Sequence, residues 1–506
     1  MSGRIAILIF LSLLFQPAYA PAVIILVPAD QPTIQDGIDA AWNGDMVVVA
    51  NGTYTGSGNI DLDFGGKIIS VKSINGPSNC VIDCQNNGRG FYFHSGETEK
   101  AVVQGFTIQN GDVLDYGGGI MCSNASPTIT GNIISGCTAG LFGGGLYCSN
   151  GSPRVINNTF SGNAAEEGGA IYCDAAYPEI MYNTISGNMA AETGGGLASS
   201  YACPTIMHNI ISGNSSLNGG GLWLFRSSGP PAVFNNIITG NWAMAWGGGI
   251  YCRGSSPALD SNTIADNTAD LDGGGFCNHS QSSMPVATNT IFWGNTAATG
   301  DEIWVGYSST FTIKYSNVEG GQASVYVGPN ATLNWGSGMM DADPLFVPGP
   351  LGDYYLSQIS AGNALDSPCL DAGDGMTGQI LSQSSRIPVG TTQAYHELDD
   401  GVLDLGCHYS IIGIANGDGP YFNRPNRKIF FDASSSFDPY GTIIGYRWDW
   451  TNDGTWDTEW LSDPIVKYSY GSGFHGQARL QVMDSDYNTN TDLVDVDIIL
   501  FPQGVS

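Results

Sequence analysis

Four aromatic residues recur along the middle of the chain at intervals that repeat. They are Tyr147, Tyr172, Trp223 and Tyr251. Rings set in a row on one face of a sheet can stack on sugar rings, and we predict a ligand-binding surface there. A plainer interpretation stays open, because aromatic residues also favour strands and can simply shield neighbouring glycine-rich turns.

A second group of residues that could carry out chemistry is acidic. Its members all precede glycine-rich triplets: Asp112, Asp115, Glu166, Glu167, Glu192, Asp270, Asp272, Asp301 and Glu302. Carboxylates brought together can bind Ca²⁺ or act as the acid–base pair of a glycoside hydrolase. A solvated acidic ridge is the simpler alternative.

A lyase would also need basic groups, and these are scarce. Between residues 101 and 300 the only cationic side chains are Arg154, Arg226 and Arg253, and Arg154 can pair with Glu179 one repeat away. His208 remains as a candidate base for the proton abstraction that a lyase requires. This scarcity weakens the lyase interpretation.

A third acidic group lies near the C-terminus. Asp449, Asp453 and Asp457 flank Gly454, and we predict that they can hold a metal ion, namely Ca²⁺, which is the one cofactor that the sequence suggests. The spacing differs from that of an EF-hand, and Asp and Gly are also the ordinary residues of turns.

The elements that must position these residues come from an internal repeat. Each copy begins with a glycine-rich triplet, and the copies start 25–28 residues apart at Gly117, Gly143, Gly168, Gly194, Gly219, Gly247 and Gly273. Most copies end with two asparagines: Asn158 and Asn163, Asn183 and Asn188, Asn209 and Asn214, Asn236 and Asn241, Asn262 and Asn267, Asn289 and Asn295. Such a period indicates a solenoid.

Each copy reads as one coil of a right-handed parallel β-helix, because its apolar runs are three or four residues long and bounded by turn residues. The copy at Gly168 predicts strands at 170–173, 179–181 and 183–186. Stacking then predicts an inward apolar column: Ile120, Leu146, Ile171, Leu197, Leu222, Ile250 and Phe276. The residue after each must point outward, and the four aromatics occupy that position.

The flanks complete an all-β organisation. Residues 32–43 predict a capping helix with Ile34, Ile38, Ala41 and Trp42 on one face. The β-helix is assigned to residues 23–410, with an irregular terminal section from 341. A linker follows at 411–420, and residues 421–506 alternate like a small immunoglobulin-like β-sandwich.

Two resemblances follow from these motifs. Gly168-Gly169-Ala170-Ile171 and Phe160-Ser161-Gly162-Asn163 resemble the paired repeats of chlamydial-type polymorphic outer-membrane proteins, which implies a right-handed parallel β-helix. The segments FDASSSFDPYGTIIGYRWDW, NDGTWD and ARLQVMDSD resemble the PKD domain, which implies an immunoglobulin-like spacer or binding module of secreted bacterial proteins.

The amino-acid composition limits the classes of molecule that the protein is expected to bind. Against 46 Asp and Glu the 506-residue chain has 16 Lys and Arg, a formal charge of −30, which disfavours nucleic acid and anionic lipid. Residues 1–22 read as a secretory signal peptide, and no later stretch can span a bilayer. The eleven cysteines can form disulfides, or pack as buried thiols.

We therefore expect a secreted or cell-surface monomer that binds polysaccharide or surface partners without catalysis, as an adhesin does. A polysaccharide lyase or glycoside hydrolase working in a groove is one alternative, and a purely structural stalk is another.

Overall fold

The protein is described here by a computed structural model. The described residues are 23–279, 283–349, 352–374, 390–391, 402–410, 415, 417, 421–423, 425–426, 428–434, 436–438, 442–485, 487 and 489–498. The predicted signal peptide at 1–22 and nearly all of the predicted linker at 411–420 lie outside them.

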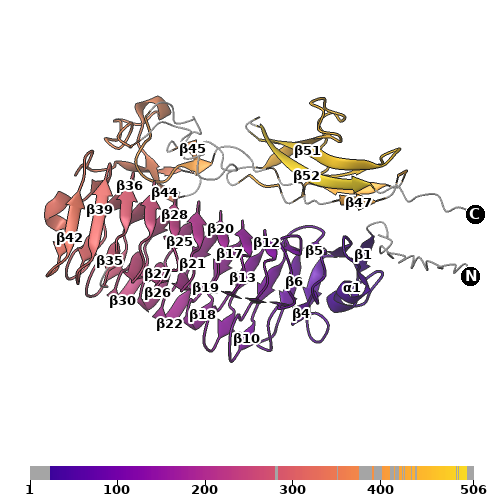
Figure 1. Ribbon diagram of the computed structural model, residues 1–506, viewed down its shortest axis with the longest axis horizontal. Coiled ribbons are helices and arrows are strands. Elements are labelled where there is room, and N and C mark those ends of the chain that lie inside the picture. Colours follow the sequence, from indigo (N-terminus) through magenta and orange to yellow (C-terminus); the bar gives the residue numbers. More distant parts are fainter. Residues whose placement is uncertain are drawn as a thin grey trace, which may run out of the picture.

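The chain winds into a parallel β-helix, as the repeat predicts (Figure 1). Its coils stack into four parallel sheets, which we number in the order that the chain meets them after each glycine triplet. Sheet 1 has eleven strands: β4 (Leu62–Asp63), β7 (Phe91–Phe93), β11 (Ile120–Ser123), β15 (Leu146–Ser149), β19 (Ile171–Asp174), β23 (Leu197–Ser200), β27 (Leu222–Phe225), β31 (Ile250–Arg253), β35 (Phe276–Asn278), β38 (Ile303–Val305) and β41 (Tyr326–Val327).

Sheet 2 begins at the mid-copy proline and has thirteen strands: β1 (Ile24–Val27), β2 (Met46–Val49), β5 (Ser70–Ser73), β8 (Val102–Gln104), β12 (Thr128–Thr130), β16 (Arg154–Ile156), β20 (Glu179–Met181), β24 (Thr205–Met207), β28 (Ala232–Phe234), β32 (Ala258–Asp260), β36 (Val286–Thr288), β39 (Thr310–Lys314) and β42 (Thr332–Trp335).

Sheet 3 follows the first asparagine of each copy and has eleven strands: β3 (Gly52–Tyr54), β6 (Cys80–Asp83), β9 (Thr107–Gln109), β13 (Ile133–Ser135), β17 (Thr159–Ser161), β21 (Thr184–Ser186), β25 (Ile210–Ser212), β29 (Ile237–Thr239), β33 (Thr263–Ala265), β37 (Ile291–Trp293) and β40 (Asn317–Val318).

Sheet 4 was not predicted, because the sequence suggests three strands per coil and the structure has a fourth in seven coils. These are β10 (Asp112–Val113), β14 (Thr138–Ala139), β18 (Ala164–Glu167), β22 (Met189–Thr193), β26 (Ser215–Asn218), β30 (Trp242–Trp246) and β34 (Thr268–Ala269). The inward residues here are small, such as Ala165 and Ala190, rather than the large apolar residues that mark the inward columns of the other sheets. They are small because the coil is narrow at this point: a Cβ on Gly169 or Gly195 would lie 2.4–2.6 Å from backbone atoms of Met189 or Ser215.

The inward columns are confirmed. All seven residues of the predicted apolar column, which begins with Ile120 and ends with Phe276, are fully buried in one continuous core. The next inward column carries Cys122, Cys148, Cys173 and Cys252. All eleven cysteines are free thiols, so the thiol interpretation of the sequence fits and the disulfide interpretation does not.

A short helix closes the N-terminal end. Helix α1 (Ile34–Ala40) begins at the N-cap Thr33, whose hydroxyl accepts the N–H of Asp36, and it buries Ile34 and Ile38. Ala41 is buried as well, but the prediction for Trp42 is wrong, because the helix has already ended and the ring is 77% exposed.

The terminal section folds back over the outer face of sheet 3. It contains the short helices η1 (Gly321–Ser324) and η2 (Ile359–Ala361) and the pairs β43 (Phe346–Gly349) with β44 (Gly352–Leu356) and β45 (Gly390–Thr391) with β46 (Tyr409–Ser410). Tyr355 and Cys407 pack on Ile237, and the Cys407 N–H donates to the Thr263 hydroxyl at 3.0 Å.

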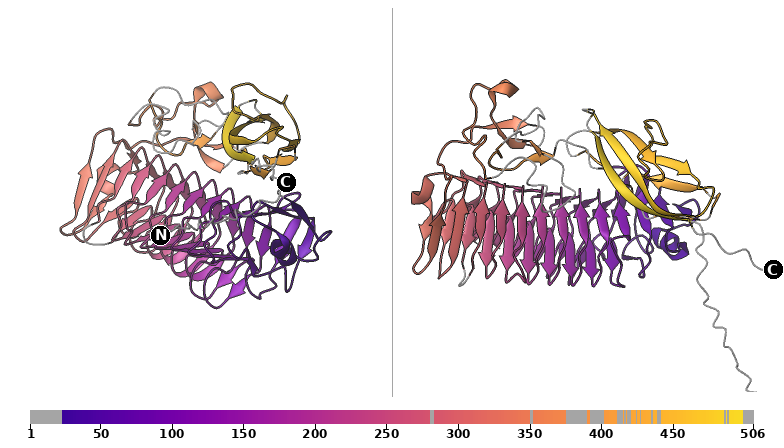
Figure 2. Two further views of the ribbon diagram at one scale, coloured as in Figure 1. Left: turned by 45° about the vertical axis from the view of Figure 1, so that its right-hand side comes forward. Right: turned by 45° about the horizontal axis from the view of Figure 1, so that its top comes forward.

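Residues 421–498 form a C-terminal unit of two small sheets around a second core. Their strands are β47 (Tyr421–Asn423), β48 (Ile429–Asp432), β49 (Ile443–Asp449), β50 (Ile465–Tyr468), β51 (Phe474–Asp484) and β52 (Thr489–Ile498). The buried Lys72 of sheet 2 pairs with the buried Asp432 of this unit, and the rings of Tyr182 and Phe437 meet edge to face. The terminal section and the unit therefore lie along one side of the rod (Figures 1 and 2).

Candidate functional site

The four predicted aromatic residues lie on the outer face of sheet 1, as the alternation requires. They belong to a second apolar cluster, separate from the coil interior, which also contains Trp304 and is flanked by Tyr116, Phe142, Phe225 and Trp246. We call this cluster the outer aromatic stripe. Rings of neighbouring coils stack in parts of the stripe: Phe142 lies 4.5 Å from Tyr172, and Tyr147 lies 5.9 Å from Tyr172. Ala198 and Cys277 take the ring position in two other coils.

The four rings are nonetheless covered. Tyr147, Tyr172, Trp223 and Tyr251 are only 3–8% exposed. Each packs beside the glycine turn of its own coil, where a Cβ on Gly168 would lie 2.8 Å from the Cβ of Tyr172. These residues therefore shield the glycine turns, and the ring faces available to a ligand belong to other members of the stripe.

The partly exposed rings come from residues that the sequence did not single out. Tyr116, Phe142 and Trp246 precede the glycine triplets, and their column continues along the rod through Glu167 and Asp272. Trp246 lies 4.6 Å from the ring of His279, which in turn meets the exposed Tyr307 at 4.8 Å. Nothing in the sequence near these residues shows that they share a column, which only the stacking of coils reveals.

The acidic residues do gather near one edge, but they do not form a continuous row. In the column that contains Glu167 and Asp272, the intervening coils carry Thr193, Asn218 and Trp246. Four coil steps separate the two carboxylates, roughly 19 Å at the usual strand spacing. Glu167 itself has a raised pKa, mainly because it is partly buried, and Glu166 and Glu192 add to the shift.

His208, the candidate base, does not face this edge. Its ring stacks on Tyr182 at 4.8 Å and its Nδ1 lies 2.7 Å from the Asn235 amide nitrogen, beneath the terminal section. Burial lowers the pKa of His208 to about 3, so the imidazole is neutral at physiological pH.

The three aspartates of the C-terminal unit shape a turn. The buried Asp449 carboxylate accepts the N–H groups of Asp453 at 3.2 Å and Gly454 at 2.9 Å, and Asp457 accepts the Trp450 N–H at 2.7 Å. Among the residues that the structure describes, no group of three or more His, Cys, Asp or Glu is arranged to hold a metal ion. Calcium binding by Asp449, Asp453 and Asp457 stays a prediction.

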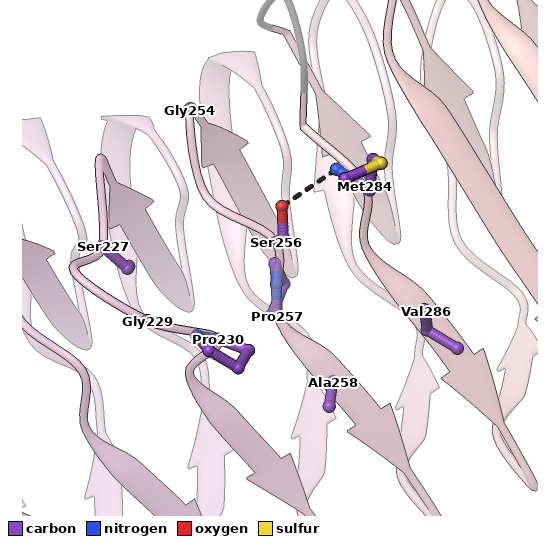
Figure 3. Close-up of a pocket in the computed structure, with 9 residues that line it drawn as sticks. All are labelled: Ser227, Gly229, Pro230, Gly254, Ser256, Pro257, Ala258, Met284 and Val286. Carbon is purple, nitrogen blue, oxygen red and sulfur yellow. Dashed lines mark hydrogen bonds between the residues drawn. The ribbon is translucent and has the colours of Figure 1, made fainter.

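A pocket that the sequence did not predict opens at the corner between sheets 1 and 2 (Figure 3). Its volume is about 450 Å³, and three successive coils line it: Ser227, Gly229 and Pro230; Gly254, Ser256, Pro257 and Ala258; and Met284 with Val286. The Ser256 hydroxyl accepts the Met284 N–H at 2.9 Å. The lining is mostly apolar, and both Met284 and Val286 are exposed.

Two asparagine ladders hold these coils in register. The first runs through Asn132, Asn158, Asn183, Asn209, Asn236 and Asn262, and the second through Asn163, Asn188, Asn214, Asn241, Asn267 and Asn295. In each ladder an amide oxygen accepts both the backbone and the side-chain N–H of the preceding coil's asparagine.

Glu302 ends the second ladder and gives it a pH dependence. Its Oε1 accepts the Asn295 N–H at 3.1 Å and its Oε2 accepts Asn295 Nδ2 at 2.5 Å. Burial raises the pKa of Glu302 to about 8, so the carboxyl group is protonated at neutral pH. Since the unfolded chain releases this proton near pH 4.5, the stabilisation is complete below that pH and is lost as pH rises towards 8.

We therefore expect unfolding free energy to fall by roughly 2–4 kcal/mol between about pH 5 and 8 through this group. Glu302→Gln keeps a neutral acceptor and should remove that component. Thermal melts of both proteins at several pH values measure the difference. Parallel profiles for the two proteins would contradict the assignment.

Comparison with known proteins agrees with the coil geometry. A family model described as a right handed beta helix region matches residues 103–264. No curated protein matches the chain. A solved structure concerned with the promiscuous specificity of carbohydrate-binding modules of the β-sandwich superfamily is 26% identical over 17% of this chain and 34% of that chain, with a TM-score of 0.15. The chain thus spans about a third of that structure, and a likeness of this extent defines neither fold nor ligand.

The described residues contain no helix long and apolar enough to cross a membrane. The parallel sheets, the continuous core and the match over the central coils lead to one conclusion. The chain folds as a parallel β-helix of stacked repeat coils, and its residues 103–264 are similar to a right handed beta helix region.

Proposed function

We propose that this protein is exported and serves as a non-catalytic rod that binds polysaccharide or surface glycans, as an adhesin does. The observation that carries the proposal is the outer aromatic stripe, in parts of which rings of neighbouring coils stack on an outer face of the rod. The buried Tyr147, Tyr172, Trp223 and Tyr251 form its base, and Trp246, His279 and Tyr307 offer the ring surface. Amphipathic rings of this kind suit the apolar faces and hydroxyl edges of sugars.

The covered side of the rod supports the same view. The terminal section hydrogen-bonds to residues of sheet 3 and its turns, and the C-terminal unit pairs with Lys72 of sheet 2. Strands of sheet 4 such as β18, β22 and β26 lie on the other side of the rod in Figure 1. We propose that the C-terminal unit is an immunoglobulin-like sandwich of the PKD kind, which spaces or attaches the rod.

A polysaccharide lyase or glycosidase remains the alternative activity. Glycoside hydrolysis places two carboxyl groups within about 5–10 Å of each other. Glu167 and Asp272 are too far apart for this, whereas Glu166, Glu167 and Glu192 lie close enough for their charges to interact. This acidic group is where catalysis would be sought. A purely structural stalk would need neither the acidic group nor the outer aromatic stripe.

Binding can be tested by affinity electrophoresis in gels that contain neutral or acidic polysaccharides, with and without calcium. Trp246→Ala and Tyr307→Ala are expected to weaken retention about fivefold to tenfold, since each removes one stacking ring. Trp42→Ala is the matched control, because this exposed tryptophan lies at the N-terminal cap, and its retention should equal that of the wild type.

Three results would count against parts of the proposal. Release of reducing or unsaturated ends would show that the protein is catalytic. Equal losses for Trp42→Ala and Trp246→Ala would show that the stripe is not the binding surface. Retention on none of the polysaccharides would favour the structural stalk. If calcium leaves the thermal melt unchanged, the prediction of a metal site at Asp449, Asp453 and Asp457 is wrong.

A further inference from the structure

The corner between sheets 1 and 2 departs from its own repeat in three adjacent coils. One position in this turn is left-handed in successive coils, with φ of 53° at Asn124, 51° at Asn150 and 72° at Gly254. Asparagine and glycine tolerate that conformation, whereas other residues are strained in it. The three coils between Asn150 and Gly254 carry Ala175, Tyr201 and Arg226, at φ of 46°, 52° and 44°.

The corner between sheets 2 and 3 also carries residues other than asparagine at its left-handed position. Between sheets 2 and 3 the left-handed position holds Tyr182 and His208 in two adjacent coils. Tyr182 meets Phe437 of the C-terminal unit, and His208 contacts Asn235, which hydrogen-bonds to His408 of the terminal section. At that corner another part of the chain rests on the rod, and it contacts the retained Asn235 and Asn289 as well as the coils that carry Tyr182 and His208.

The side chains at the first corner instead face solvent. Tyr201 is 48% exposed and Arg226 is exposed, so the strained backbone presents them outward. Strained backbone of this kind is typical of functional positions.

Stacking brings a second arginine to the same place. Phe225 and Arg253 are register partners in β27 and β31. The guanidinium carbons of Arg226 and Arg253 lie 5.1 Å and 5.9 Å from the Phe225 ring centroid, and Arg226 donates to the Tyr201 hydroxyl at 3.2 Å. We call Tyr201, Phe225, Arg226 and Arg253 the arginine corner.

These two arginines lie next to each other without a carboxylate partner. Five other cationic side chains pair with acidic side chains within 4 Å: Lys72, Arg89, Arg154, Lys314 and Arg479. Within the part of the chain that the structure describes, neither Arg226 nor Arg253 does so. In a chain with 46 acidic and 16 basic residues, two adjacent guanidinium groups without a carboxylate stand out against the overall composition.

The pocket of Figure 3 continues from the arginine corner. Ser227 directly follows Arg226, and Gly254 directly follows Arg253. The corner therefore offers cations and an aromatic ring, and the pocket adds serine hydroxyls and an apolar floor that includes Pro257 and Met284.

We propose that the arginine corner and its pocket bind an anionic sugar of an acidic polysaccharide. The inference rests on the proposed function and names its substrate class. Guanidinium groups match carboxylate and sulfate groups with paired N–H donors, and the Phe225 ring and the pocket floor match a sugar's apolar face. The net charge of −30 opposes this only at long range, because charges are screened beyond about 8 Å at physiological salt.

The test compares matched polysaccharides by isothermal titration calorimetry. The probes are polygalacturonate, the same polymer with its carboxyl groups reduced to alcohols, and dextran sulfate. We expect polygalacturonate to bind at least tenfold more tightly than its reduced form and to weaken with added salt. Binding of dextran sulfate instead would identify sulfate as the group that is recognised.

The variants separate binding from folding. Arg226→Asn places the favoured residue in the left-handed turn, so it should melt no lower than the wild type while losing affinity. Combined with Arg253→Gln, it should weaken acidic-polymer binding at least tenfold and leave binding of the reduced polymer unchanged. Arg154→Gln is the control, because that arginine pairs with Glu179 at 3.1 Å and lies outside the corner.

Each remaining outcome is decisive. Equal binding of the acidic and reduced polymers, or full acidic-polymer binding by the double variant, would overturn the arginine corner and leave the proposed function standing. Failure of the wild type to bind any of the probes or any other polysaccharide would overturn the proposed function itself.

Discussion

Gly220→Ala is expected to destabilise the β-helix by more than about 4 kcal/mol. A Cβ on Gly220 would lie 2.5 Å from the Trp242 carbonyl oxygen and 2.7 Å from that of Gly248. Both neighbours are backbone atoms of stacked strands, so they cannot move aside without breaking sheets 1 and 4. Urea unfolding followed by circular dichroism measures the loss.

Gly187→Ala is the matched control. Gly187 has a φ of 64°, and a Cβ added there would have nothing within 4 Å of it. Only the left-handed conformation is then strained, at about 1–2 kcal/mol. If the two variants unfold at the same urea concentration, close backbone approach is not the reason for the glycine triplets.

This contrast explains how much of the fold could be predicted from sequence. The repeat predicted the coil, its inward columns and three of its four strands, because each coil must satisfy the same packing as its neighbours. Backbone conformation explains the first glycine of each triplet, such as Gly219 at φ 67°. The second glycine makes close contact with sheet 4, as Gly220 does with Trp242, and the third makes close contact with the next coil's triplet and a ladder asparagine, as Gly221 does with Gly249 and Asn241. Those contacts appear only when the coils are stacked.

The candidate site was less predictable for a related reason. The outward direction of Tyr172 follows from alternation alone, but its burial depends on Phe142, which belongs to the preceding coil and stacks on it at 4.5 Å. Likewise, nothing in the sequence near Arg226 points to Arg253. The register of β27 with β31 brings them to one corner, and only a coil-by-coil alignment of the turns shows that Tyr201 and Arg226 occupy an asparagine position.

The second large effect concerns the asparagine ladders, which join each coil of the central repeat to its neighbours. The Asn214 amide nitrogen donates to the Ile185 carbonyl at 2.9 Å and to Asn241 Oδ1 at 3.0 Å, and its Oδ1 accepts both N–H groups of Asn188. Asn214 is fully buried. Asn214→Ala therefore leaves several polar groups in the core without partners, and we expect a loss of about 3–5 kcal/mol.

Asn214→Asp sharpens the argument, because it keeps the shape and the acceptor but replaces the donor with a second oxygen. That oxygen would face the carbonyl of Ile185, so the variant should be at least as unstable as Asn214→Ala at neutral pH and should recover when the carboxyl group is protonated in acid. Asn334→Ala is the control: Asn334 is exposed and its amide donates to the Thr312 hydroxyl, at 3.1 Å. Hydrogen exchange should show the opening centred on the coils next to residue 214. Uniform exchange along the rod would mean that the ladder does not hold the coils locally. A melt of Asn214→Ala equal to that of Asn334→Ala would mean that the ladder contributes nothing measurable to stability.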